Sequence, residues 1–318
     1  MADVFYILGI YKIFLIVAGT IGNLLIFIVC VKLKDNTTFM LLRFLSISDM
    51  ISLYFWNLSQ FTTALFNFDM QNFNFYYCKF FEFAQFTSLQ VSAWILALIS
   101  CDRYLTIAFT TWKIKTIKAN GGLKVGLAVV ILLAGLNFHC LFTFGHVEYV
   151  NGTEIVQCYA TDIPSTRIMA TWNTVHAFFY SYIPFCMIAV ANFLLVISIL
   201  RKNKVSTATA TNAKNRNIFM NITVFSITIL FIVLTCPGAI ASSYFNVLIQ
   251  SYSGRVILFS VDSLTFSYHS LSFITLFITN KKFSKELYYL FTCRRIEDRT
   301  VNFSTTNPSI QINNSKIN

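Results

Sequence analysis

Seven long apolar stretches punctuate the 318-residue chain, and they constrain its fold more than any other feature. A helix needs about 20 apolar residues to cross the hydrocarbon core of a bilayer. The stretches cover approximately residues 6–31, 40–66, 76–109, 123–144, 169–200, 215–245 and 255–279. Because lipid offers no partners for backbone polar groups, each stretch is predicted to be a helix. We therefore expect an all-α membrane protein, a bundle of seven transmembrane helices.

The charge content and the ends of the chain fit this assignment. Charged residues make up 12% of the chain, about half of what a soluble domain carries. The first apolar stretch follows Asp3 rather than a basic segment and has no cleavage site, so we expect a retained helix and not a signal peptide. The chain divides into one membrane domain, residues 1–293, and a polar tail, residues 294–318, that is expected to be disordered.

Lysine and arginine lie mainly in alternate connections between the stretches, and this predicts the orientation. They crowd the first, third and fifth connections and the segment after the last stretch, whereas the other connections hold only Lys79, Arg167 and Arg255. Cytoplasmic connections carry the excess of positive charge. We therefore expect a plasma-membrane protein with its N-terminus outside and its C-terminus in the cytoplasm. The net charge of +11 follows this topology and does not require a nucleic acid partner.

Three features near the connections indicate how the chain is modified and anchored. Asn151-Gly152-Thr153 is a glycosylation acceptor in an outer connection, so we expect a glycan on Asn151. Residues 281–291 separate apolar and basic side chains onto two faces, which predicts a short amphipathic helix in the membrane interface. Cys293 follows directly and is a candidate for palmitoylation, with an unmodified cytoplasmic thiol as the alternative.

An ionisable triplet, Asp102-Arg103-Tyr104, lies at the inner end of the third stretch. Charges at membrane depth are expensive to bury, so by default they mark function. Further distinctive residues fall at fixed places in the other stretches. They are Gly22, Asn23, Leu45, Asp49, Cys78 (25 residues before Arg103), Cys158, Pro184, Phe231 (six residues before Pro237) and Pro237. In this order the set resembles the rhodopsin-like G-protein-coupled receptors, and the resemblance covers residues 10–293.

The resemblance implies a receptor that a ligand activates from outside and that signals to a heterotrimeric G-protein. Arg103 would pair with Asp102 at rest and be released on activation, with Tyr104 part of the same switch. Pro237 would kink the sixth helix and provide a pivot, and Phe231 would belong to the relay in the core. The alternative for Asp102 and Arg103 is a salt bridge that only anchors the end of the helix.

Two further groups of residues follow from the resemblance. Cys78 and Cys158 would form a disulfide that holds the second outer connection over a ligand pocket, since both face the oxidising side. Asp49 would lie at mid-membrane near Asn23 and Ser92, where a buried carboxylate needs a cation or a proton. We expect Asp49 and Ser92 to hold a sodium ion at rest, or Asp49 to titrate during activation; a neutral, hydrogen-bonded Asp49 is the alternative. No other cofactor is expected.

The chain departs from the family pattern in its sixth and seventh stretches. Thr235 stands in place of the usual tryptophan before Pro237, and Ser272 in place of the asparagine of the seventh helix. The inner activation relay is therefore altered. These departures, together with the phenylalanine-rich stretches, resemble the divergent invertebrate receptors for FMRFamide-type neuropeptides.

Four residues are candidates for the ligand pocket. Gln85 lies seven residues after Cys78, where the family's amine receptors carry an aspartate, so a small amine is not the expected ligand. Glu82 lies one turn above Gln85, and Asp262 lies in the outer half of the seventh stretch. These carboxylates favour a cationic ligand, such as a short amidated peptide that ends in Arg-Phe. His176 is the fourth candidate, with simple packing as its alternative role.

Other interpretations stay open at this point. The two carboxylates could be solvated at the rim, beside Lys79 or Arg255. A chemosensory receptor of the same fold, for small environmental molecules, is the main alternative function. A transporter or channel is more remote, because no internal repeat is visible. No nucleotide loop, metal cluster or nucleophile–base pair is found in the sequence, so an enzyme is not expected. The basic fifth connection, residues 201–216, would meet the G-protein and anionic lipid.

Overall fold

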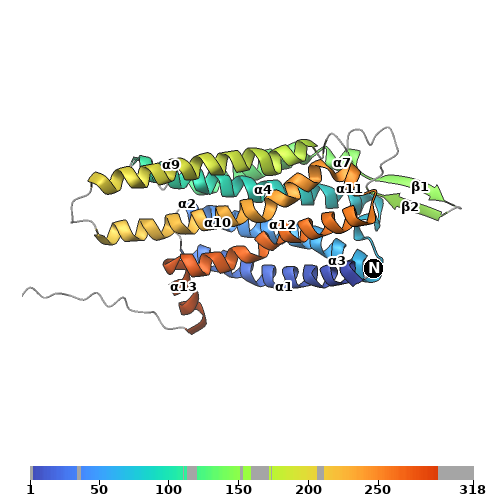
Figure 1. Ribbon diagram of the computed structural model, residues 1–318, viewed down its shortest axis with the longest axis horizontal. Coiled ribbons are helices and arrows are strands. Elements are labelled where there is room, and N and C mark those ends of the chain that lie inside the picture. Colours follow the sequence, from blue (N-terminus) through green and yellow to red (C-terminus); the bar gives the residue numbers. More distant parts are fainter. Residues whose placement is uncertain are drawn as a thin grey trace, which may run out of the picture.

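The long helices of the protein run side by side along one axis (Figure 1). This computed structural model describes residues 3–33, 37–109, 111–112, 120–150, 153–158, 172, 174–205 and 211–292. The start of α1 (Asp3–Lys32) and a β-hairpin lie together at one end of the bundle, which we name the hairpin end. α13 (Lys281–Thr292) lies at the opposite end, which we name the tail end.

Seven helical segments form the bundle, as predicted. They are α1; α2 (Thr37–Ser52) continued by η1 (Leu53–Asn57) and α3 (Leu58–Phe66); α4 (Phe75–Ala108); α6 (Gly121–Asn137) with α7 (Cys140–Thr143); η3 (Phe178–Tyr182) with α9 (Ile183–Val205); α10 (Thr211–Ser243); and α12 (Tyr252–Thr279). In the described part of the chain, all but the last contain a helix long and apolar enough to cross a membrane by composition alone. α12 is more polar, and it packs against α1 and α10. The first residues of the fifth predicted stretch, 169–171, lie outside the described ranges.

α4 is the central helix of the bundle and contacts α2, α6, α9 and α10. Small side chains recur along it and are buried: Ser88, Ser92, Ala93, Ala97 and Ser100. Small residues allow membrane helices to approach closely, and serine hydroxyls hydrogen-bond between them. The central position of α4 therefore follows from its sequence. In this position α4 contacts most of the polar groups described below.

Two π-helical turns, η1 and η3, interrupt the regular helices. Such turns are frequent at functional sites, because the wider turn reorients the side chains that follow. η1 carries Trp56 and the fully buried Asn57, whereas η3 carries the buried Tyr180 and Ser181. Both turns thus bury polar groups inside the bundle, and neither turn was predicted.

Two glycines allow α12 to lie close to its neighbours. A Cβ at Gly22 of α1 would come within 2.8 Å of Phe273 Cβ in α12. A Cβ at Gly238 of α10, directly after Pro237, would collide with Thr265 Oγ1 in α12. The Gly22 contact lies one residue before Asn23, so the glycine also brings this amide against α12.

α13 is the predicted amphipathic helix. Phe283 and Leu287 are buried, whereas its lysines are exposed. The Phe283 ring packs edge-on against Phe273 of α12, with ring centroids 6.0 Å apart. The backbone N–H of Phe283 donates to Asn280 Oδ1 at 3.1 Å, which caps the start of the helix.

A β-hairpin at the hairpin end was not predicted. β1 (His146–Val150) pairs antiparallel with β2 (Thr153–Gln157), and the register runs from Val150↔Thr153 to His146↔Gln157. The sequence does contain a signal for it, because an Asn-Gly pair between runs rich in β-branched residues is typical of hairpins.

Candidate functional site

The ionisable triplet lies near the tail end of α4. The Arg103 guanidinium donates to the carboxylate of its neighbour Asp102, and both side chains are less than 10% exposed. Asp102 also receives long hydrogen bonds, each 3.4 Å, from Thr38 Oγ1 of α2 and Trp112 Nε1. Tyr104 is partly exposed beside them. The paired state that the resemblance implied for rest is therefore present, and its role as a switch stays a prediction.

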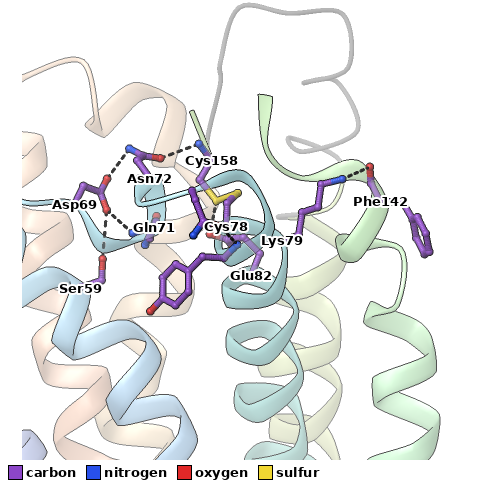
Figure 2. The surroundings of a disulfide bond; sticks show 11 residues. Ser59, Asp69, Gln71, Asn72, Cys78, Lys79, Glu82, Phe142 and Cys158 are labelled. Carbon is purple, nitrogen blue, oxygen red and sulfur yellow. Dashed lines mark hydrogen bonds between the residues drawn. A yellow bond between two sulfur atoms is a disulfide. The ribbon is translucent and has the colours of Figure 1, made fainter. Parts of the chain in front are cut away.

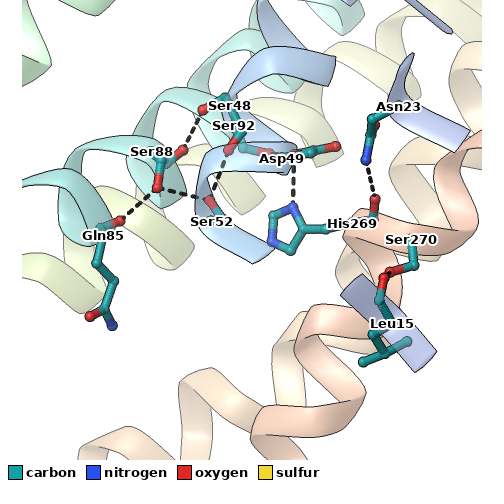
Figure 3. Close-up of polar contacts among 10 residues, drawn as sticks. All are labelled: Leu15, Asn23, Ser48, Asp49, Ser52, Gln85, Ser88, Ser92, His269 and Ser270. Atoms are coloured by element: carbon teal, nitrogen blue, oxygen red, sulfur yellow. Dashed lines mark hydrogen bonds and ion pairs between the residues drawn. The ribbon is translucent and has the colours of Figure 1, made fainter. Parts of the chain in front are cut away.

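A buried carboxylate, Asp49 of α2, forms the centre of a polar network between α2, α4 and α12 (Figure 3). Its Oδ1 accepts a hydrogen bond from Ser92 Oγ at 2.6 Å and lies 2.7 Å from His269 Nδ1. Both Asp49 and His269 are fully buried. Asn23 Nδ2 of α1 donates to the backbone oxygen of His269 at 2.8 Å, so the same histidine ties a fourth helix to the network.

His269 is a site residue that sequence reasoning missed. It looked like one of four scattered histidines in an apolar stretch. A signal was nevertheless available, because residues three apart lie on the same face of a helix. His269 precedes Ser272 by three residues, and Ser272 stands in the place of the asparagine that the family carries in its seventh helix.

Three buried oxygens of α1, α2 and α12 are candidates to hold a small cation. Asp49 Oδ2, Asn23 Oδ1 and Ser272 Oγ are buried and have no hydrogen-bond partner within the described ranges. A carboxylate with neutral oxygens is the donor set that hard cations prefer, and orphaned buried oxygens call for an ion or water. Asp49 and Ser92 would be the residues that hold the ion. The same negative charge would also be balanced by a protonated His269.

Phe231, which the resemblance assigns to a core relay, lies in an aromatic cluster next to Thr235, the threonine in the place of the family's tryptophan. Phe231 of α10 is fully buried, and its ring packs edge-on against Tyr268 of α12 at 5.0 Å and Phe185 of α9 at 5.4 Å. Thr235 Oγ1 donates back to the Phe231 carbonyl at 2.6 Å. Pro237 lies inside α10 and supplies no N–H to the helix. Phe231 thus joins three helices just on the tail side of the proline.

Asp262, one of the candidates for the ligand pocket, forms an ion pair that the sequence did not predict. It pairs with Lys12 of α1, whose side chain is fully buried, while 25% of the Asp262 side chain is exposed. Trp56 Nε1 donates to the same carboxylate at 2.7 Å. The Lys12 ammonium also faces the rings of Phe259 and Phe266, with its nitrogen 5.1 and 5.4 Å from their centroids. The expected alternative partners of Asp262, Lys79 and Arg255, are replaced by this lysine.

Glu82 is also not at a solvated rim. It is fully buried in α4, and its Oε1 lies 3.8 Å from Cys158 Sγ, directly beneath the disulfide (Figure 2). A carboxylate there is shielded from solvent by the hairpin segment that the disulfide holds. Gln85, one turn further, is 5% exposed, and its side-chain Oε1 has no hydrogen-bond partner among the described residues.

His176 is engaged with its neighbours. Its Nδ1 lies 3.1 Å from Gln90 Nε2. Its ring lies 4.6 Å from that of Phe86 and stacks on Tyr180 at 5.5 Å. These contacts match the packing role that was the alternative for this residue, and a contact with ligand stays a prediction.

The predicted disulfide joins Cys78, in the first turn of α4, to Cys158, directly after β2. The Cα atoms lie 5.6 Å apart, and 80 residues separate the cysteines in sequence. Asn72 supports the same junction, because its Oδ1 accepts the backbone N–H of Cys158 at 2.8 Å. The bridge therefore holds the β-hairpin at the mouth of the bundle. The candidate glycosylation and lipidation sites, Asn151 and Cys293, and the tail after them lie outside the described residues.

Comparison with known proteins bears on the whole of this arrangement. No curated protein matches the chain significantly. A family model described as 7 transmembrane receptor (rhodopsin family) matches residues 22–275. That segment contains the Asp49 centre, the disulfide, the Asp102–Arg103 pair and the Phe231 relay. The chain therefore belongs to the rhodopsin family of seven-transmembrane receptors.

Proposed function

We propose that the protein is a plasma-membrane receptor that binds a ligand at its hairpin end and activates a heterotrimeric G-protein at its tail end. In this proposal the hairpin end faces outward and the tail end faces the cytoplasm. One observation carries it: a single bundle (Figure 1) has a disulfide-held β-hairpin at its hairpin end, and the other end of α4 carries the buried Asp102–Arg103 pair. A ligand can shift such a bundle between states only through its different affinity for each.

The ligand site is proposed among unpaired polar groups of the bundle interior. Gln85 Oε1, Tyr180 Oη and Tyr268 Oη are buried, and none has a hydrogen-bond partner in the part of the chain that the structure describes. Gln85 comes from α4, whereas Tyr180 of η3 and Tyr268 of α12 both pack against the Phe231 ring. Buried polar groups are normally hydrogen-bonded, so a bound ligand or water would complete them. The relay then carries a displacement of Tyr268 directly to Phe231.

The proposed ligand is a short cationic amidated peptide, as for receptors of the FMRFamide type. The aromatic interior suits a phenyl ring. A ligand guanidinium would compete with Lys12 for Asp262, or reach Glu82 beneath the disulfide, and bidentate pairing favours arginine in either place. A chemosensory receptor for small environmental molecules is the second candidate. Two observations favour it, the full burial of Glu82 and the Lys12–Asp262 pair, because both remove free negative charge from the mouth of the bundle.

The experiment is a reporter assay for G-protein activation in cells that express the receptor. A library of amidated neuropeptides and a library of volatile compounds are screened in parallel. A signal from the peptides alone supports the peptide proposal, whereas a signal from the volatile compounds alone refutes it and supports the second candidate. Arg103→Ala should abolish the signal at equal surface expression, and Asp102→Asn should raise the basal signal. A receptor that signals equally well with Arg103→Ala would refute the proposed switch.

Sodium is proposed to occupy the Asp49 site at rest, where it would supply the positive charge that the buried carboxylate needs. Asp49 and Ser92 would hold it. The measurement is agonist affinity with sodium or with choline as the only monovalent cation. Sodium should lower agonist affinity in the wild type and have no effect in Asp49→Asn. Affinity that does not depend on sodium in either protein would refute the sodium site and leave His269 as the counter-charge.

A further inference from the structure

The free edge of the β-hairpin is formed by β2. Along a strand, the backbone N–H and C=O groups of alternate residues point to opposite edges. The N–H of Cys158 points away from β1, because it donates to Asn72 Oδ1 at 2.8 Å. The backbone groups of Val156 and Glu154, two and four residues earlier, therefore point to this same edge. In the described part of the chain the sheet has only two strands, so this edge has no partner strand.

A cleft of about 790 Å³ runs along this edge. One wall is β2 and Cys158, so consecutive backbone groups line it. The other wall is the connection that includes η2 (Met70–Asn72), with Asp69, Phe73 and Asn74. Asn72 bridges the walls at the disulfide end (Figure 2). One wall of the cleft thus presents backbone groups of β2 that β1 does not use, and the opposite wall presents polar and aromatic side chains.

The cleft is negatively charged. Asp69 and Glu154 line its two walls, and neither forms an ion pair within the described ranges. Both oxygens of Asp69 are held in place, one by the N–H of Gln71 at 3.0 Å and the other by Asn72 Nδ2 at 2.9 Å. Lys79, which follows the disulfide cysteine, turns away: its ammonium lies 4.2 Å from the Phe75 ring centroid and 3.4 Å from the Phe142 carbonyl (Figure 2).

We infer that this cleft binds an extended polypeptide segment that carries a basic residue, which adds as a third strand along β2. Strand addition to an exposed edge obtains affinity from main-chain hydrogen bonds and specificity from the side chains. Glu154 and Val156 supply the main-chain groups, and Asp69 and Glu154 receive the basic side chain. The inference rests on the proposal that the ligand is a peptide, and it assigns a second contact, outside the helix bundle, to the part of that peptide that stays in the extracellular medium.

The test measures binding to the intact, disulfide-bonded receptor in lipid nanodiscs, with no G-protein. The probe is an acetylated, amidated pentapeptide of alternating valine and arginine with a fluorescent label, and the readout is fluorescence anisotropy. A matched probe is N-methylated on the backbone nitrogens that would face β2, and another has glutamate in place of arginine. One main-chain hydrogen bond contributes roughly a threefold to tenfold change in affinity. The N-methylated probe should therefore bind at least threefold more weakly, and the glutamate probe more weakly still.

Variants of Glu154 separate charge from backbone. Glu154→Gln removes the carboxylate alone, whereas Glu154→Pro also removes an N–H that β1 does not use, a substitution that edge strands tolerate. Glu154→Pro should bind the probe roughly threefold to tenfold more weakly than Glu154→Gln, and the probe should slow amide hydrogen exchange at Glu154 and Val156 in the wild type. Equal binding of the N-methylated and unmodified probes overturns the inference, and that comparison needs no variant to fold. If the two probes bind equally but peptides activate the receptor, only the inference about the cleft is refuted. If the unmodified probe binds along β2 but no peptide activates the receptor, only the proposed function is refuted.

Discussion

The Lys12–Asp262 pair allows a quantitative test of how charge is held in this bundle. Lys12 is fully buried, whereas a quarter of the Asp262 side chain is exposed and Trp56 donates to it. Removal of one partner from a buried ion pair costs about 3–5 kcal/mol, because an uncompensated charge remains. Asp262→Asn leaves the buried Lys12 ammonium without a counter-charge, because only a neutral amide oxygen and two ring faces remain beside it, so its cost should reach that range. Lys12→Met leaves a carboxylate that keeps solvent and Trp56, so its cost should be about 1–3 kcal/mol.

The double variant Lys12→Met with Asp262→Asn should be within about 1 kcal/mol of the wild type, because neither charge remains. The assay is thermal unfolding of the purified receptor in one detergent at one scan rate, since membrane proteins of this size commonly unfold irreversibly. At about 2 °C per kcal/mol, Asp262→Asn should lower Tm by roughly 6–10 °C, Lys12→Met by roughly 2–6 °C, and the double variant by less than about 2 °C. A double variant whose loss equals the sum of the single losses would falsify the pairing, and a greater loss in Lys12→Met than in Asp262→Asn would refute the burial argument.

Three further substitutions test other contacts by the same thermal assay. Gly238→Ala should lower Tm and weaken agonist-induced signalling, because the added Cβ collides with Thr265 Oγ1. Its control, Gly135→Ala, has nothing within 4 Å of the added Cβ and should be neutral or stabilise the receptor by about 0.5–1 kcal/mol. Equal effects of the two substitutions would contradict the close approach of α10 and α12 next to Pro237. Cys78→Ser, Cys158→Ser and the double variant should each lower the stability of the receptor by a similar amount, about 2–5 kcal/mol. Cys186 is an exposed free thiol, so Cys186→Ser should leave the stability unchanged. A double variant as stable as the wild type would show that the bridge does not hold the hairpin. His269→Ala should cost about 1–3 kcal/mol because it removes the ring nitrogen that lies 2.7 Å from the buried Asp49 Oδ1. Asp49→Asn added to it should cost less than the sum of the two single changes; additive losses would mean that the ring acts by packing alone.

The positions of the helices along the chain were predictable, because a local property decides them. Hydropathy over about 20 residues separates segments that lipid can solvate from those that it cannot. All seven predicted stretches overlap helices, and the pattern at residues 281–291 predicted α13. α12 shows the limit of this argument: its serines, Asp262 and His269 lower its hydropathy, yet it packs as the seventh helix because α1 and α10 cover its polar face.

The polar contacts of the candidate site were only partly predictable. The Asp102–Arg103 pair joins neighbours in sequence, and the Asp49–Ser92 and Cys78–Cys158 contacts followed from family motifs. The Lys12–Asp262 and Asp49–His269 contacts were missed, although all four residues are in plain view in the sequence. Their partners are 250 and 220 residues apart, so nothing local links them.

The sequence by itself thus determined that the chain crosses a membrane as helices and where each helix begins and ends, to within a few residues. Its motifs also place the chain among receptors. Tertiary structure alone decided which charge neutralises which. That choice depends on the rotation of each helix about its axis, which packing against distant segments sets: the contact of Gly22 with Phe273, the π-turns at Trp56 and Tyr180, and the disulfide that covers Glu82. Inside a bilayer a buried charge must find a partner within reach, and only the assembled bundle establishes that Asp262 faces Lys12 and that Asp49 faces His269.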